Sequence, residues 1–146
     1  MKILKYLLTI AVIGTLLFTC KTNKSTTDSN RSVNIKEGDT VRIANDSIEY
    51  EIIIIEPGFN TWLISRARPE GYYSQQFLEN RNLIYVQEWN YRVMQPQLYN
   101  PNLYEMQIDY RPGIDYGYEV NYKLYNYFIY FQLTYKQRLA GFVPRI

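Results

Sequence analysis

The chain has 146 residues, which is enough for one domain, since domains commonly run to about 100–150 residues. It contains no histidine and one cysteine, so its composition excludes Ser/His/Asp and Cys/His catalysis and zinc-type sites, and we expect no cofactor and no metal. The formal net charge of +2 lies in the N-terminal segment. Removing that segment with Lys2 and Lys5 leaves fourteen basic side chains against fourteen acidic ones, which gives no support for nucleic-acid binding.

The N-terminal segment has the pattern of an export signal. Residues 1–18 place two lysines at the start of an apolar run, as in the charged and hydrophobic regions of a signal peptide. The run from Ile3 to Phe18 is shorter than the roughly 20 apolar residues of a membrane-spanning helix and contains Lys5, so a retained transmembrane anchor is the weaker interpretation. The sequence therefore predicts a signal peptide over residues 1–19.

The apolar run ends at "LLFTC", and Cys20 is the only cysteine in the chain. This stretch resembles the lipobox of bacterial lipoproteins, in which the cysteine is acylated, for example by palmitate, and becomes the first mature residue. The alternative is an incidental free thiol beside an uncleaved signal, although a lone cysteine in an exported chain needs an explanation. We therefore expect Cys20 to be a lipid anchor that places the protein in the bacterial cell envelope, facing the periplasm.

Residues 20–39 link this anchor to the rest of the chain. They are polar and rich in Ser, Thr, Asn and Lys. Such a segment has too little apolar surface to offset the entropy of ordering. We expect it to be a flexible tether, followed by one domain over residues 40–146.

Residues 40–55 have the pattern of a β-hairpin. Two runs rich in β-forming residues flank Asn45, Asp46 and Ser47, whose side chains favour turns. The second run ends in four consecutive isoleucines, Ile52–Ile55, so we expect one end of that strand to be covered on both faces. Residues 59–67 fit a short helix or a third strand, and the sequence leaves both open.

Two longer segments are typical of helices. Residues 73–94 carry apolar side chains at helical spacing with polar side chains between them. Residues 95–114 contain three prolines and predict an irregular connection. Residues 115–124 alternate as in a strand, but the longer aromatic pattern predicts a helix over 117–138, capped by Asp115 and supported by the ion pair of Glu119 with Lys123. The expected fold class is therefore α+β, a small single domain with an N-terminal β-hairpin packed against two aromatic-rich helices.

The aromatic side chains of the last helix are best explained as core, because one buried ring removes about 150–250 Å² from water. Three tyrosines fall outside its main apolar stripe, and they either pack on a second face or form a platform for a ligand. The two tryptophans and a pair of arginines two residues apart add further contact surface. The candidate ligand or partner contacts are Trp62, Arg66, Arg68, Trp89, Tyr122, Tyr125 and Tyr130.

Catalysis by a carboxylate pair is the one enzymatic option that the composition leaves. The candidate acids are Glu49, Glu51, Glu56, Asp109, Asp115 and Glu119. Acidic side chains near tyrosines are common on any protein surface. The sequence therefore favours a protein that is not an enzyme.

Three stretches together resemble a family of small bacterial envelope lipoproteins of unknown function. They are "EYEIIIIEPGFNTWL" (49–63), "NRNLIYVQEWNYRV" (80–93) and "IDYGYEVNYKLYNYFIYF" (114–131). The resemblance implies export and a lipid anchor, and it implies no catalytic residues. The leading hypothesis is an accessory or protein-interaction role in the envelope, with membrane lipid and an envelope protein as partners. The alternative is a binding module for an envelope glycan or peptide, and a carboxylate-dependent hydrolase comes third.

Overall fold

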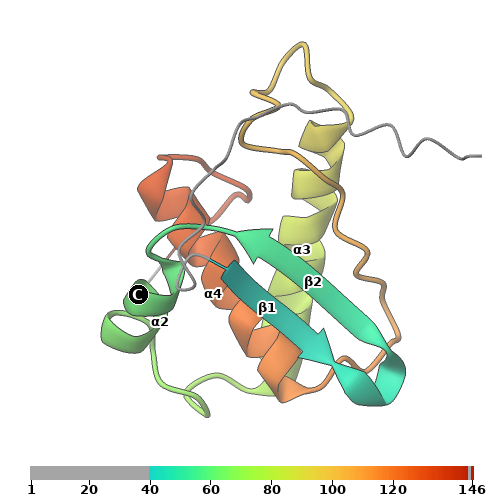
Figure 1. The fold of residues 1–146 in the computed structure, drawn as a ribbon, viewed down its shortest axis with the longest axis vertical. Helices are drawn as coiled ribbons and strands as arrows, with labels where there is room; N and C mark the ends of the chain where they lie inside the picture. Colours follow the sequence, from blue (N-terminus) through green and yellow to red (C-terminus); the bar gives the residue numbers. More distant parts are fainter. Residues whose placement is uncertain (1–39, 145) are drawn as a thin grey trace, which may run out of the picture. The chain divides into compact units, whose positions relative to one another are not determined.

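The computed structural model describes residues 40–144 and 146 of the chain. The expected signal peptide, Cys20 and the tether lie outside these residues. The described part consists of a two-stranded antiparallel sheet followed by three helices (Figure 1). The predicted α+β fold class is confirmed.

The hairpin predicted over residues 40–55 is confirmed. Strands β1 (Thr40–Asn45) and β2 (Tyr50–Ile55) pair along their whole length, and a single 3-10 turn, η3 (Asp46–Ile48), joins them. The side chain of Asn45 accepts a hydrogen bond of 3.0 Å from the backbone N–H of Ser47, which fixes the start of the turn. Glu49 closes the turn in a left-handed conformation, with a φ of 52°.

The hairpin has one covered face. Val41 and Ile43 of β1 are buried in the core, whereas Ile53 and Ile55 of β2 are 54% and 53% exposed. The expectation that the isoleucine-rich end is covered on both faces is wrong. Successive side chains of a strand point to opposite faces, and the described helices pack on one face of this sheet, so every second isoleucine stays outside.

Residues 59–67 are settled as a helix, α2 (Phe59–Ser65). Gly58 precedes it with a φ of 84°, a left-handed conformation that glycine adopts without strain. A side chain at this position would also meet the hydroxyl of Tyr130 at 3.2 Å. Phe59 is fully buried and anchors the helix to the core.

The helix predicted over 73–94 is α3 (Gln75–Val93). The Ser74 hydroxyl accepts a hydrogen bond of 3.2 Å from the backbone N–H of Phe77, as an N-terminal cap does. Pro96 disfavours a helical conformation at the residue before it, so the helix ends shortly ahead of this proline.

The helix predicted over 117–138 is α4 (Tyr118–Thr134), which ends four residues early. Its N-cap is Gly117 without a side-chain hydrogen bond. The predicted cap at Asp115 is wrong, because that carboxylate accepts hydrogen bonds from Gly117 N and the Gln75 side chain instead. The predicted ion pair of Glu119 with Lys123 is present at 2.7 Å.

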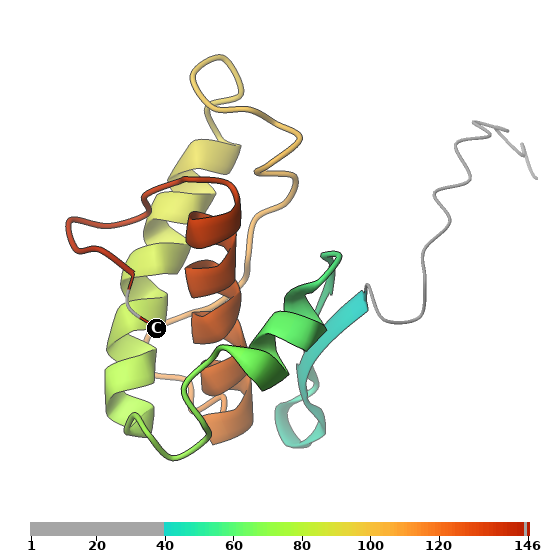
Figure 2. The same ribbon diagram turned by 90° about the vertical axis from the view of Figure 1, so that its left-hand side faces the viewer.

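Helices α3 and α4 run side by side in the same direction (Figure 2). Asn82 bonds to Asn121 near their starts, and the rings of Trp89 and Phe131 lie 4.8 Å apart near their ends. Parallel neighbours need a connection that returns along the full helix, which is roughly 28 Å for the 19 residues of α3. Residues 94–117 make this return without regular structure, as predicted for 95–114.

Helix α4 occupies the middle of the domain. It packs against α3 on one side and against α2 and β1 on the other (Figure 2). Within residues 40–144, no helix combines the length and the apolar character that crossing a bilayer requires.

Phe128 of α4 tests this arrangement, because its side chain is fully buried. Replacing Phe128 by Ala should lower the free energy of unfolding by about 3–5 kcal/mol through lost apolar burial and the cavity left behind. Leu133 of the same helix is 41% exposed, and its replacement by Ala should change stability by about 0.5 kcal/mol or less. Denaturant unfolding measures both changes in stability. Equal losses at the two positions would contradict an α4 that buries Phe128 and exposes Leu133.

Candidate ligand groove

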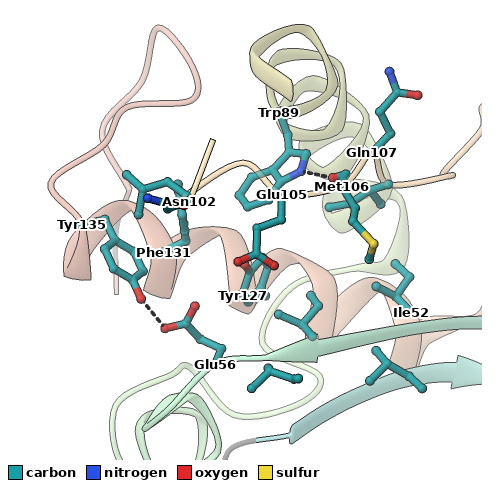
Figure 3. A pocket seen from close by; sticks show the side chains of 15 residues that line it. Ile52, Glu56, Trp89, Asn102, Glu105, Met106, Gln107, Tyr127, Phe131 and Tyr135 are labelled. Atoms are coloured by element: carbon teal, nitrogen blue, oxygen red, sulfur yellow. Dashed lines mark hydrogen bonds between the residues drawn. The ribbon is translucent and has the colours of Figure 1, made fainter. Parts of the chain in front are cut away.

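A groove with a volume of about 330 Å³ lies between β2, α4 and the connection (Figure 3). This volume is within the range of sites for small ligands or side chains. One wall is the isoleucine run Ile52–Ile55 of β2, and the other is formed by residues 102–103 and 105–108. Trp89 of α3 and Tyr127, Phe131 and Tyr135 of α4 form an aromatic floor.

The groove follows the free edge of β2. All four residues of the run Ile52–Ile55 line it, although their side chains alternate between the two faces of the sheet. Because β1 occupies the other edge of β2, the hollow between these residues and the connection lies along the unpaired edge. In an antiparallel pair, alternate residues of an edge strand direct N–H and C=O groups away from their partner, and no backbone hydrogen bond joins this edge to another described segment.

The opposite wall is irregular in backbone conformation but fixed by α3. The indole N–H of Trp89 donates to the carbonyl of Met106 at 2.8 Å. The side chain of Asn90 both donates to the carbonyl of Ile108 and accepts from its N–H, each at 2.8 Å. These three bonds satisfy backbone groups that a strand or helix would otherwise pair.

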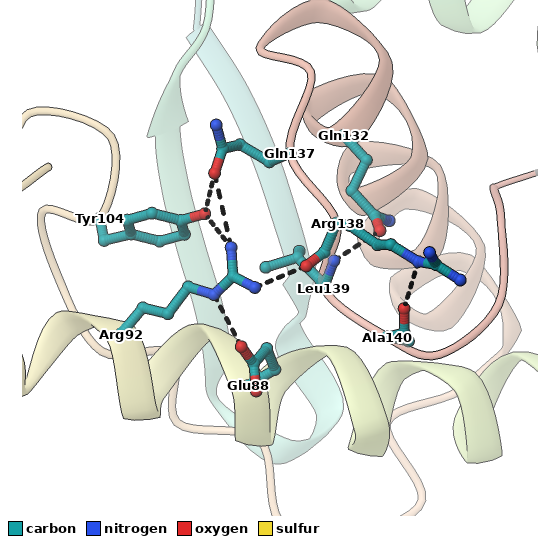
Figure 4. A network of polar contacts seen from close by, with 8 residues as sticks. All are labelled: Glu88, Arg92, Tyr104, Gln132, Gln137, Arg138, Leu139 and Ala140. Carbon is teal, nitrogen blue, oxygen red and sulfur yellow. Dashed lines mark hydrogen bonds and ion pairs between the residues drawn. The ribbon is translucent and has the colours of Figure 1, made fainter. Parts of the chain in front are cut away.

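Arg92 holds the connection at Tyr104, next to this wall (Figure 4). Its guanidinium pairs with Glu88 at 2.7 Å and donates to the hydroxyl of Tyr104 at 2.7 Å and to the carbonyl of Arg138 at 2.5 Å. The Tyr104 hydroxyl in turn donates to the Gln137 side chain at 3.1 Å. One arginine therefore joins α3, the connection and the segment after α4.

Glu56, directly after β2, brings a carboxylate into the groove. It is 7% exposed and accepts a hydrogen bond of 2.9 Å from the hydroxyl of Tyr135. Burial raises the pKa of Glu56, the Tyr135 hydrogen bond partly offsets this rise, and the negative charge of Glu105 adds to it. Burial and the same hydrogen bond raise the pKa of Tyr135 to about 12.

Glu105 comes from the opposite wall, and Figure 3 shows its carboxylate pointing toward Glu56 across the groove. Among the hydrogen bonds of the described residues, none involves Glu105 or the second carboxylate oxygen of Glu56. The hydroxyl of Tyr127 has no hydrogen bond either, although this side chain is only 4% exposed. Burial, followed by the charge of Glu56, raises the pKa of Tyr127. The groove thus collects polar oxygens whose hydrogen-bonding capacity is unused.

The three tyrosines of α4 for which the sequence left both packing and a ligand platform open are packed. Tyr122, Tyr125 and Tyr130 are 5%, 5% and 9% exposed, because α4 is covered on more than one side. The hydroxyl of Tyr122 donates to the carbonyl of Arg68 at 2.7 Å, and that of Tyr130 donates to the carbonyl of Pro57 at 2.7 Å. They have the packing role, which is the first of the two roles that the sequence left open.

The other predicted contacts lie apart from one another. Trp89 lines the groove, but Trp62 is partly buried against the ring of Tyr130 at 5.6 Å. Arg66 is exposed after α2, and Arg68 stacks over Tyr72 at 5.0 Å. Cys20 lies outside the described residues. A binding role for Trp62, Arg66 and Arg68 stays a prediction.

A second hollow, of about 600 Å³, includes Arg68, Arg81 and Tyr125. Its two cationic groups already have partners. Arg68 donates to the carbonyl of Ile146 at 3.1 Å, and Arg81 lies 3.9 Å from the centre of the Phe142 ring. We therefore place the candidate site at the groove, where polar groups lack partners.

Of the six acids proposed from the sequence, Glu56 alone lines the groove. Several of the others pair with neighbouring basic side chains, as Glu51 does with Arg42 and Asp109 with Arg111. Glu105, Tyr127 and Tyr135 are the site residues that sequence reasoning missed. Within the described chain, no three acidic or cysteine side chains gather as a metal site would require.

The raised pKa of Glu56 predicts a pH-dependent stability. Relative to the ordinary value of 4.5, folded Glu56 holds its proton to higher pH than unfolded Glu56 does. Its contribution to stability is therefore present below that value and is lost as the pH rises through the raised pKa. In Glu56→Gln this loss is absent, so the stability of wild type relative to the variant should fall across that window.

Urea unfolding at a series of pH values measures this difference. The titratable groups that face Glu56 are Glu105, Tyr127 and Tyr135. Glu70→Gln is the control, because Glu70 is exposed and lies outside the groove. A stability difference between wild type and Glu56→Gln that does not change with pH would contradict the prediction.

A family model described as a family of unknown function (DUF6146) matches residues 7–144 of the chain. No curated protein and no solved structure matches the chain.

Proposed function

We propose, for a chain that belongs to the family of unknown function DUF6146, a role as a non-enzymatic binding protein of the bacterial cell envelope. Its groove takes an extended segment of a protein partner, and its N-terminus holds it at the membrane. The observation that carries this proposal is the groove along the free edge of β2.

A free strand edge beside a groove suits a peptide in extended conformation. Such a peptide adds a strand to a sheet, and its backbone pairs with the unpaired N–H and C=O groups of the edge. Every second side chain of the bound segment then points to the same face, so one side chain can enter the hollow above the aromatic floor. Ile53 and Ile55, each more than half exposed, offer apolar contact beside the edge.

This geometry favours a peptide over a glycan. A peptide repeats its donors and acceptors at the spacing of a strand, and a saccharide does not. The tyrosines that were candidates for stacking on sugar rings are buried, as described for Tyr122, Tyr125 and Tyr130. Trp89 reaches the groove, but its indole N–H is already bonded to Met106.

The envelope location rests on the sequence. The apolar run ending at Cys20 and the polar segment after it support a lipid-anchored protein with reach above a membrane. The intact mass of the protein extracted from membranes should show the loss of residues 1–19 and the addition of acyl chains. A soluble product that retains residues 1–19, or a Cys20 without acyl chains, would contradict the anchor.

The groove is tested with two exposed methionines. Met106 lines the groove and is 67% exposed, and Met94 lies outside it and is 63% exposed. A tryptophan at Met106 should fill the groove and weaken binding of an extended peptide at least about tenfold, corresponding to about 1.4 kcal/mol. The same change at Met94 should leave binding unchanged.

The probes are peptides selected from a displayed random library on the full chain in detergent, with affinity read by fluorescence anisotropy. Amide hydrogen exchange of residues 52–55 should slow when a peptide binds, because backbone groups at the edge become paired. Equal losses of peptide affinity in Met94→Trp and Met106→Trp would rule out strand addition at this edge. Amide hydrogen exchange along β2 that stays unchanged when a peptide binds would also rule it out.

A carboxylate-dependent hydrolase is the second candidate, because Glu56 and Glu105 face each other in one groove. A buried acid with a raised pKa opposite a second carboxylate is the pattern that glycosidases use. Ligands recovered intact after long incubation would favour the binding role. Cleavage that Glu56→Gln abolishes would favour the hydrolase.

A further inference from the structure

We infer that the segment bound in the groove presents a lysine or arginine side chain, whose cationic head lies between Glu56 and Glu105. This inference rests on the proposed function, because it names the chemistry of the partner that the same groove would take. Three observations on the groove carry it: its charge, its unused hydrogen-bonding capacity and its apolar approach.

The charge of the groove is uncompensated by the described chain. Glu56 and Glu105 come from opposite walls, and no lysine or arginine is among the described residues that line the groove. Two basic side chains on neighbouring elements have other partners, since Arg92 pairs with Glu88 and Arg42 pairs with Glu51. Two like charges that face one hollow repel each other. A cation placed between them is attracted to both carboxylates, and these two attractions outweigh the repulsion.

Several oxygens of the groove have no hydrogen-bond partner in the described structure. The second oxygen of Glu56 and both oxygens of Glu105 accept no hydrogen bond in the described structure, and the Tyr127 hydroxyl has no partner. Glu56 and Tyr127 are both more than nine-tenths buried, and their oxygens without partners are accessible from the groove, so a ligand there can contact them. A lysine ammonium offers three donors and an arginine guanidinium offers five, which suits this set of oxygens.

The approach to the carboxylates is apolar and aromatic. A long basic side chain carries a hydrocarbon stem that packs on apolar surface while its head reaches the polar groups. The rings of Trp89 and Phe131 on the floor provide such a surface, and aromatic faces also attract cations. An acidic side chain would add a third negative charge, and a neutral polar side chain would leave the two carboxylate charges uncompensated.

The test repeats the library selection on wild type and on Glu105→Gln, with Glu70→Gln as the control. Glu105 is the primary variant because it is exposed and makes no hydrogen bond in the described chain, so its replacement should leave the unfolding curve unchanged. Glu70 is also exposed, and Glu70→Gln removes one negative charge outside the groove. Peptides selected on wild type and on Glu70→Gln should share a lysine or arginine at one position, and this enrichment should disappear on Glu105→Gln.

A matched peptide pair gives the magnitude. Replacing the shared basic residue by norleucine should weaken binding to wild type about tenfold and should matter much less for Glu105→Gln. Selected peptides without a shared basic residue, or a basic preference that persists in Glu105→Gln, would overturn the inference. In either case, slower amide hydrogen exchange along β2 on peptide binding would still support the proposed strand addition. A library that yields no binder would overturn the proposed function and this inference together.

Discussion

The burial of α4 on every side is the constraint on which the rest of the structure depends. Twelve of its seventeen residues are buried, and they lie all around the helix. A helix without an exposed polar face is stable in water only when other segments enclose it. In this small domain α3, α2 and the hairpin each cover part of it, and the connection covers part of the remainder.

The enclosed helix also carries polar groups, and these organise its surroundings. Asn121 accepts hydrogen bonds from the side chains of Asn82 and Tyr110, and Gln132 accepts one from the backbone of Leu139. Each bond crosses to another segment. Because a buried polar group without a partner is costly, these bonds specify where the surrounding segments lie as well as how stably they pack.

The same principle applies to the tyrosines. Their rings lie in the core, while the hydroxyls of Tyr122 and Tyr130 reach the backbone of the loops that flank α2. The high tyrosine content is thus explained by a small core whose large rings also hold irregular segments in place.

The sequence was sufficient for the elements that depend on local pattern. The hairpin follows from turn-forming residues at Asn45 to Ser47, and α3 and α4 follow from spacing over many residues. The error at Ile53 and Ile55 has a tertiary cause, because a strand cannot reveal from its own residues whether its second face is covered. The burial of Tyr125 has the same cause, since α4 has more than one packed side.

The groove was beyond sequence reasoning for a related reason. Glu105 lies in a segment without periodicity, and nothing in its neighbours indicates that it faces Glu56. The two are brought together by the return of the chain between two parallel helices. Glu56 itself was a candidate by residue type, and only the fold separates it from the solvated acids such as Glu51.

The bonds from Trp89 and Asn90 to the connection have a consequence for kinetics. The conformational entropy of this wall is lost when the chain folds, so a ligand does not have to order it on arrival. Association then resembles the docking of a rigid body, with a rate set by diffusion and orientation rather than by rearrangement. The width of the groove is consequently a property of the unliganded domain, and a side chain too bulky for it is rejected at the first encounter.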